Sequence, residues 1–196
     1  MSMIPDKPPF KLLDILYKKE FILFVVLITI LIINSNLTPY FLDLYNLIDS
    51  TFLFSEKAII ALTMTFVIIA RQIDLSVASI IAVSSVVLGY TTSLGYDTWL
   101  IISLTLLSGA LCGAFNGAII TKFAIPSIIV TIGTMSLFRG LAYSFLEDSY
   151  YNKFPKIVSN LGSGYLFGYI PYAFLTFILL ALVFAFILHK TTVGKK

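Results

Sequence analysis

The stretch Ala58–Ser93 decides the fold, because it contains two apolar segments separated by a short polar one. It reads AIIALTMTFVIIA (58–70), RQIDLS (71–76) and VASIIAVSSVVLGYTTS (77–93). A helix needs about 20 apolar residues to cross a membrane, and the first segment is too short before Arg71 interrupts it. Adjoining short apolar segments with polar residues between them are typical of discontinuous membrane helices. An ordinary tight turn between two helices, with Asp74 or Ser76 as an N-cap, is the alternative.

The rest of the chain is a series of further apolar segments. Of its 196 residues, 59% are apolar and only 12% are charged, and the mean hydropathy is +0.99. A soluble domain is nearer half apolar and a quarter charged, so lipid is the expected solvent. We predict an all-α bundle of about six transmembrane helices in a single domain over residues 1–196, with a broken helix near residues 71–76. The apolar segments fall at 12–33, 57–70, 75–94, 98–121, 125–146 and 169–189.

The composition excludes several kinds of chemistry. The net charge of +3 is too small and too scattered to favour binding to nucleic acid. Cys112 is the only cysteine and His189 the only histidine, so a CxxC site, a His-rich metal site and a Ser-His-Asp triad are not available. We therefore expect no catalytic residues, no metal and no cofactor on this chain.

The basic residues predict the orientation in the membrane. With six spans and a cytoplasmic N-terminus, the inside segments carry most of the Lys and Arg residues, as the positive-inside rule requires. We therefore predict that both ends are cytoplasmic (N-in/C-in). The inside residues are Lys7, Lys11, Lys18, Lys19, Arg71, Lys122, Lys190, Lys195 and Lys196, and the outside ones are Lys57, Lys153 and Lys156.

The fourth apolar segment contains a row of small residues. Gly109, Gly113 and Gly117 recur every four residues and share one helix face. Such a face lets another helix approach closely, so we predict helix packing there, either static or as a sliding surface. Asn116 adjoins the row and needs a partner or a wet cavity, because an unpaired amide in hydrocarbon is costly.

Charged residues interrupt two of the apolar segments. Arg71 and Asp74 lie three residues apart and either neutralise one another or form a functional site, which is the default reading of charges inside a membrane. The fifth segment carries Thr131, Thr134 and Arg139. Arg139 either snorkels to the surface or faces a wet cavity, where its guanidinium would hydrogen-bond a polyhydroxylated ligand or a neighbouring helix.

Six short motifs follow one another along these segments, namely MTFVII (64–69), IDLSVAS (73–79), GAFNG (113–117), PSIIVTIGTM (126–135), FRGLAY (138–143) and IPY (170–172). In order and spacing, from about residue 38 to residue 194, they resemble the permeases of ABC importers for monosaccharides, the group for ribose, xylose, arabinose, rhamnose and autoinducer-2. Within that group the chain looks most like the rhamnose-type permeases.

The resemblance implies a function and partners. Such a permease forms the pathway for a monosaccharide across the bacterial inner membrane, as one of two permease copies in a homodimer or heterodimer. A periplasmic binding protein delivers the sugar and largely determines which sugar is carried. A cytoplasmic ABC ATPase hydrolyses ATP, and the chain has no Walker P-loop of its own. We therefore expect a transport subunit embedded in lipid, and not an enzyme.

The chain departs from the family at its end. Family members continue past Thr191–Gly194 into the segment that docks on the ATPase, so we expect this chain to be the N-terminal part of a longer permease. A self-sufficient secondary transporter or channel, or a non-functional fragment acting as a membrane scaffold, is the alternative. The residues expected to line the pathway are Gln72, Asp74, Ser76, Asn116, Thr131, Thr134 and Arg139.

Overall fold

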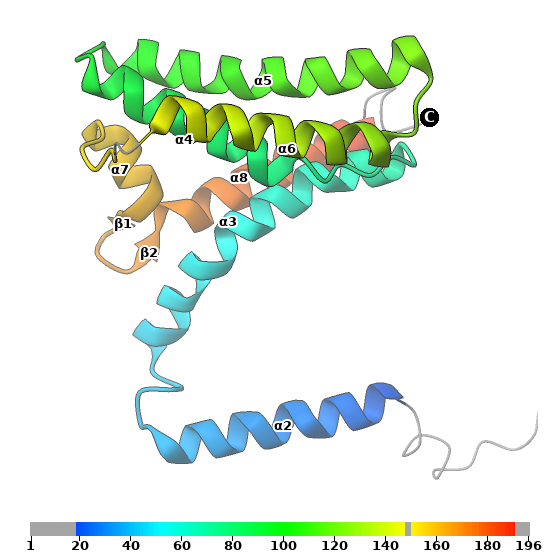
Figure 1. Cartoon of the computed structure of the whole chain (residues 1–196). Coiled ribbons are helices and arrows are strands. Elements are labelled where there is room, and N and C mark those ends of the chain that lie inside the picture. The colour runs from blue at the N-terminus through cyan, green and yellow to red at the C-terminus, as the bar shows by residue number, and fades with distance from the viewer. Residues whose placement is uncertain (1–18, 148–149, 191–196) are drawn as a thin grey trace, which may run out of the picture. The chain divides into compact units, whose positions relative to one another are not determined.

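The computed structural model describes residues 19–147 and 150–190, which are almost entirely helical (Figure 1). This part of the chain forms seven helices and one two-stranded hairpin, which confirms the predicted all-α class. The chain divides into two compact units, Met1–Ser50 and Thr51–Lys196, and helix α3 (Leu44–Ile69) contains the boundary.

The first unit contains α2 (Lys19–Leu37) and the first turns of α3. The apolar pattern predicted a helix end at residue 33, but α2 continues to Leu37 because its polar residues bond to its own backbone. The side-chain amides of Asn34 and Asn36 donate to the carbonyls of Ile30 and Ile32, each at 2.8 Å. Residues 12–18 of the predicted span lie outside the described residues.

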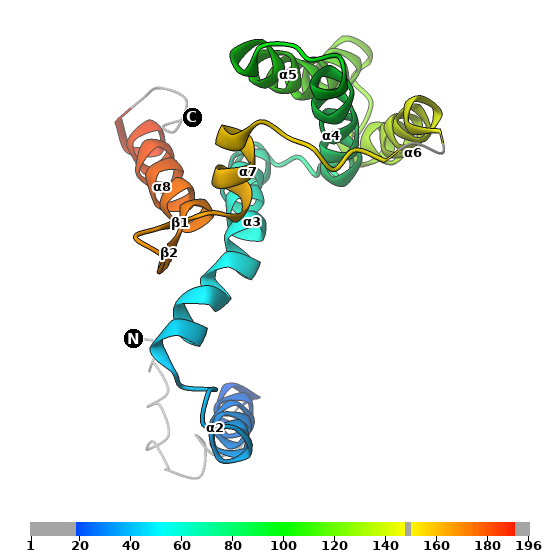
Figure 2. The ribbon, with the colours of Figure 1, turned by 90° about the vertical axis from the view of Figure 1, so that its left-hand side faces the viewer.

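Three helices pack together in the second unit, α4 (Val77–Ser93), α5 (Thr98–Phe123) and α6 (Ser127–Leu146). α4 lies between the other two and contacts both extensively (Figure 2). Asp97 caps the N-terminus of α5 by accepting the N–H of Trp99 at 2.9 Å. Ala124 ends α5 in the left-handed conformation, and Pro126 directly precedes α6.

The remaining elements of this unit are α7 (Lys156–Ser163), β1 (Tyr165–Leu166), β2 (Ile170–Pro171) and α8 (Tyr172–Lys190). The two strands pair antiparallel. Helices α3 and α8 meet through aromatic pairs. The ring centroids of Phe66 and Phe184 lie 5.0 Å apart, and those of Phe54 and Phe174 lie 6.5 Å apart, both edge to face.

The helices of the second unit alternate in direction. In Figure 1, α3, α5 and α8 run from left to right, and α4 and α6 run from right to left. α6 begins at the right-hand end, whereas α4 begins further in, after the non-helical segment 70–76. The chain turns back at residue 70 and becomes helical again only inside the bundle. The interruption therefore lies where the polar residues placed it, and it joins two antiparallel helices, as in the alternative of a turn with Asp74 as the cap.

The second span is longer than the sequence suggested, and its prediction as a short apolar segment from residue 57 was wrong. α3 contains 26 residues and passes through Glu56 and Lys57, whose side chains are exposed. The short helix is α4, with 17 residues. Among the described residues, five helices are long and apolar enough to cross a membrane, namely α2, α3, α5, α6 and α8.

The described residues are arranged as expected for a protein surrounded by lipid. Large apolar side chains cover the outside of the helices, and the exposed ones include Leu106, Leu111 and Leu182. Among the described residues, eight buried side chains are polar and six, Pro171 included, are apolar. Packing in lipid does not require an apolar interior, so polar side chains gather where helices meet. The chain is a multi-pass membrane protein.

Candidate functional site

The break begins with an abrupt end to α3. Arg71 has a positive φ of 57°, and its N–H donates to Ile68 O at 2.9 Å. The next N–H, from Gln72, donates to Val67 O at 3.0 Å. This pair of bonds is a Schellman motif, which usually has glycine at the left-handed position. Neither glycine nor proline marks this end of the helix in the sequence.

Asp74 organises the start of α4. Its Oδ1 accepts the N–H of Ser76 at 2.8 Å and the Ser76 hydroxyl at 2.6 Å. Ser76 occupies the N-cap position but makes no capping bond itself, so Asp74 has the capping role. A carboxylate beside a helix N-terminus is also favoured by the helix dipole. Asp74 therefore bonds to Ser76 and is not held by an ion pair with Arg71.

Asn116 connects this cap to α5. Its Nδ2 donates to Ser76 Oγ at 2.8 Å, so three side chains form one directional series, Asn116 to Ser76 to Asp74. Asn116 lies seven residues before the end of α5 at Phe123. At the helical rise that is roughly 10 Å, so α4 begins about that far inside the end of α5.

One polar atom in this series has no partner. Asn116 is 4% exposed, and its Oδ1 is shielded from water and accepts no hydrogen bond from the part of the chain that the structure describes. The bond to Ser76 fixes the amide orientation, because the Ser76 hydroxyl hydrogen is already donated to Asp74. An unsatisfied buried acceptor costs about 1–3 kcal/mol.

Two side chains of helix α6 bond to the backbone of the non-helical segment 70–76. The N–H of Ile73 donates to Ser127 Oγ at 3.0 Å, and the carbonyl of Ile73 accepts from Thr131 Oγ1 at 3.3 Å. Ser127 and Thr131 are four residues apart and therefore on one face of α6. Irregular backbone inside a membrane requires such partners. We name Asp74, Ser76, Asn116, Ser127 and Thr131 the break cluster.

A cavity of about 340 Å³ adjoins the break cluster, and we name it the α3–α5 cavity. Its volume is in the range of small-molecule sites. Gln72 and Asp74 line it from the break. The other lining residues are Phe66, Val67, Ala70, Ile73, Gly113, Asn116, Gly117, Ile120, Ser127 and Thr131.

The small-residue row on α5 has two kinds of surroundings. A Cβ on Gly109 would lie 3.2 Å from Ser84 Oγ and 3.8 Å from Ile80, so this glycine lets α4 approach. A Cβ on Gly113 or Gly117 would meet no atom within 4 Å. Both of these glycines line the cavity instead, and their predicted packing role stays a prediction.

Most of the predicted pathway residues lie together. Asp74, Ser76, Asn116 and Thr131 belong to the break cluster, and Gln72 is on the cavity wall. Thr134 is buried one turn further along α6, and its hydroxyl donates to the Thr131 carbonyl at 3.4 Å.

Two buried serines that support the break were not among the predicted site residues. Ser127 binds the backbone of Ile73, and Ser79 donates to Ser76 O at 2.7 Å. A serine directly after Pro126, at the start of an apolar segment, is a signal that could have found Ser127.

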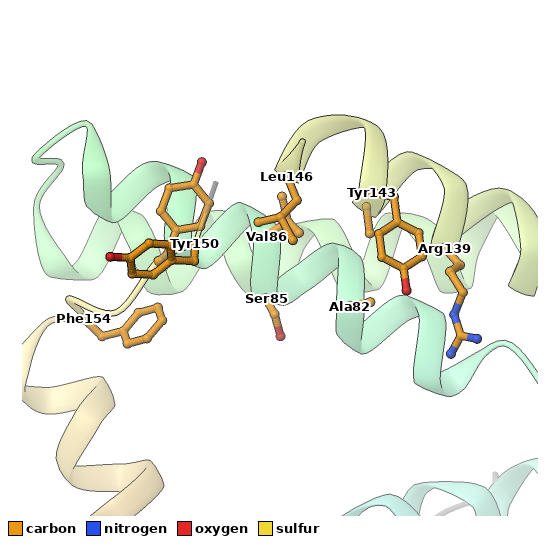
Figure 3. Close-up of a pocket in the computed structure, with 10 residues that line it drawn as sticks. Ala82, Ser85, Val86, Arg139, Tyr143, Leu146, Tyr150 and Phe154 are labelled. Carbon is orange, nitrogen blue, oxygen red and sulfur yellow. The ribbon is translucent and has the colours of Figure 1, made fainter. Parts of the chain in front are cut away.

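Arg139 lies away from the break cluster. It lines a second cavity of about 450 Å³ between α4 and α6, which we name the α4–α6 cavity. Figure 3 shows Arg139 and Tyr143 projecting from the same side of α6, with Tyr150 and Phe154 further along. No hydrogen bond or ion pair joins the guanidinium to residues 19–147 or 150–190.

The described residues, 19–147 and 150–190, contain no group of three or more His, Cys, Asp or Glu that could hold a metal ion.

Comparisons with known proteins give the chain its relatives. It is 40% identical over 121 residues to the autoinducer 2 import system permease protein LsrD of Klebsiella pneumoniae, covering 62% of this chain and 36% of the relative. It is 31% identical over 179 residues to the ribose import permease protein RbsC of Haemophilus influenzae, covering 88% and 54%. It is 33% identical over 172 residues to the autoinducer 2 import system permease protein LsrC of Photorhabdus luminescens, covering 86% and 52%.

The chain thus spans between about a third and just over half of the length of these relatives. No solved structure matches it. Residues 46–196 match the family described as "Branched-chain amino acid transport system / permease component". This match includes the break, the cluster and both cavities, and the chain belongs to this family of transport-system permeases.

Proposed function

We propose that this chain is a permease subunit of an ABC importer that carries a monosaccharide, of the rhamnose or ribose kind, across the bacterial inner membrane. The observation that carries the proposal is the break cluster beside the α3–α5 cavity, roughly 10 Å inside the end of α5. Buried polar groups are expensive inside a membrane and mark substrate pathways.

The chemistry of the α3–α5 cavity suits a neutral polyol. Asp74 and Asn116 offer acceptor oxygens, and the amide of Gln72 offers both donors and an acceptor. Sugar hydroxyls both donate and accept. The family description names branched-chain amino acids. Among the described residues, however, no Lys or Arg lines this cavity to bind the carboxylate of an amino acid.

The proposed pathway continues toward the other end of the bundle. Thr134 follows Thr131 along α6, and Arg139 lies about one and a half turns beyond Thr134. The guanidinium of Arg139 brings five donors to the α4–α6 cavity. A hydroxylated substrate would therefore meet donors at one end of the pathway and mainly acceptors at the other.

The proposed partners follow from this function. A cytoplasmic ABC ATPase supplies the energy, a periplasmic binding protein delivers the sugar, and a second permease copy completes the pathway. The chain itself is then a transport subunit and not an enzyme. We further propose that residues 1–196 form one permease domain and that a further segment couples it to the ATPase.

The test is purification of the tagged chain with its cellular partners, followed by reconstitution into liposomes. We expect an ABC ATPase to copurify, and we expect uptake of radiolabelled D-ribose or L-rhamnose, but not of L-leucine, that stops when ATP is withheld. Sugar flux without ATP or an ATPase would instead support a secondary transporter or channel. A chain that retains no ATPase and carries no solute would be a membrane scaffold.

A further inference from the structure

The glycine row of α5 divides into one packing residue and two residues that face open space. Gly109 lies against Ser84 of α4, and a Cβ there would come within 3.2 Å of the serine hydroxyl. Gly113 and Gly117 have nothing within 4 Å of the position of a Cβ. Identical spacing in the sequence therefore gives two different surroundings in the fold.

The open part of the row belongs to one wall of the α3–α5 cavity. Gly113, Asn116, Gly117 and Ile120 follow the spacing i, i+3, i+4 and i+7, so they share a face of α5, and all four line the cavity. The last turn of α3 lines it from the other side with apolar residues. The cavity volume of about 340 Å³ is in the range of small-molecule sites.

An unpaired atom on the same face indicates the kind of ligand. Asn116 is buried, and its Oδ1 has no donor among the described residues. Its Nδ2 is already committed to Ser76. The wall therefore lacks a hydrogen-bond donor, which a hydroxyl group would provide. The carboxylate of Asp74, on the same cavity, disfavours an anion.

We propose that Gly113 and Gly117 form the floor of a site for a small neutral polyol, and that the lack of a side chain at both positions sets the size of the ligand. Asn116 lies between them and accepts a ligand hydroxyl through Oδ1. Since Oδ1 is shielded from water in this structure, its neighbours shift when the hydroxyl binds. The proposal rests on the sugar-transport function proposed above and assigns the residues that limit the size of the sugar.

Alanine at either position adds a methyl group, about the size of a water molecule, to this wall of the cavity. A six-carbon sugar such as L-rhamnose has less room to shift than D-ribose. We therefore expect Gly113→Ala and Gly117→Ala each to weaken binding of L-rhamnose about tenfold and binding of D-ribose less.

The experiment uses the full chain in lipid nanodiscs, with calorimetric titration of L-rhamnose and D-ribose and a thermal unfolding measurement on each variant. Gly109→Ala is the matched control, because it makes the same change on the same helix face but against Ser84. We expect Gly109→Ala to lower the melting temperature and leave sugar affinity unchanged. The two cavity variants should leave the melting temperature unchanged or raise it, since alanine favours the helix.

Four outcomes overturn the inference. Equal effects of all three variants on affinity would mean that the row acts only through general packing. A lower melting temperature for Gly113→Ala and Gly117→Ala, with sugar affinity unchanged, would mean that another helix packs there. If the wild-type chain binds neither sugar, both this inference and the proposed sugar site fail, whereas wild-type binding that the cavity variants do not change contradicts only the inference.

Discussion

The Ser127→Ala variant tests whether the side chains of α6 hold the break in place. The Ser127 hydroxyl accepts the N–H of Ile73 at 3.0 Å in a site where the serine is 8% exposed. Alanine keeps the helix but leaves that N–H without its partner. An unsatisfied buried donor costs about 1–3 kcal/mol, whereas measured side-chain hydrogen bonds in membranes average about 0.6 and reach about 1.7 kcal/mol.

From these bounds we expect Ser127→Ala to destabilise the folded segment by about 1–2 kcal/mol. That corresponds to a factor of about 5–30 in a local opening equilibrium. Thr131→Val should have a smaller effect, because the Thr131 hydroxyl divides its hydrogen between Ile73 O at 3.3 Å and Ile128 O at 3.4 Å. The opening is local, so the Ile73 amide is its most direct reporter.

Hydrogen–deuterium exchange of the chain in nanodiscs measures this opening. We expect the Ile73 amide to exchange about 5–30 times faster in Ser127→Ala than in the wild type. Ser136→Ala is the control, since it changes an exposed serine on the same helix. If Ser127→Ala and Ser136→Ala exchange at the same rate at Ile73, the α6 side chains do not hold the break, and the reasoning is refuted.

Three further tests by substitution concern other parts of the structure. Gly89→Ala should destabilise the chain by about 1–3 kcal/mol in chemical unfolding, because its Cβ would lie within 2.8 Å of Tyr151. Tyr151→Gly, which also removes the Tyr151 Cβ, should relieve this loss in the double variant, and no relief would disprove the contact. Arg71→Gly should stabilise the chain by about 1 kcal/mol by relieving the left-handed backbone, and an unchanged unfolding midpoint would argue against that strain. In a complete permease, Asp74→Ala and Arg139→Ala should reduce sugar uptake more than membrane insertion, and an equal loss of both would make these residues structural.

The sequence was most informative where polar residues interrupt apolar segments. Gln72, Asp74 and Ser76 identified the break, and Asn116 was expected to need a polar partner, which is Ser76. These predictions succeeded because a polar group in an apolar segment must be paired or wet. The position of a charge along the chain, by contrast, did not give the length of α3, since exposed charges such as Glu56 and Lys57 can project from the surface of a helix.

Other features depend on the arrangement of the helices and could not be read from spacing. Gly109, Gly113 and Gly117 are equivalent in the sequence, but only the position of α4 makes Gly109 a packing residue. Ser127 resembles any serine near a helix start until the backbone of Ile73 is placed beside it. The sequence shows that Arg139 interrupts an apolar segment. That Arg139 lines the α4–α6 cavity and not the α3–α5 cavity depends on how the helices pack.

The bonds at the break also indicate how ligand binding would affect it. Ile73 is held by hydroxyl groups, and the start of α4 is held by the Asp74 carboxylate. These bonds belong to side chains that rotate, unlike the fixed backbone bonds within a helix. In the same cluster, the Asn116 carbonyl lacks a donor, so any arrangement that supplies one is favoured relative to the present one. A polyol that reaches Asn116 therefore shifts the population toward that arrangement by its difference in affinity for the two states. Binding of a polyol at Asn116 and a rearrangement of the break would then be thermodynamically linked.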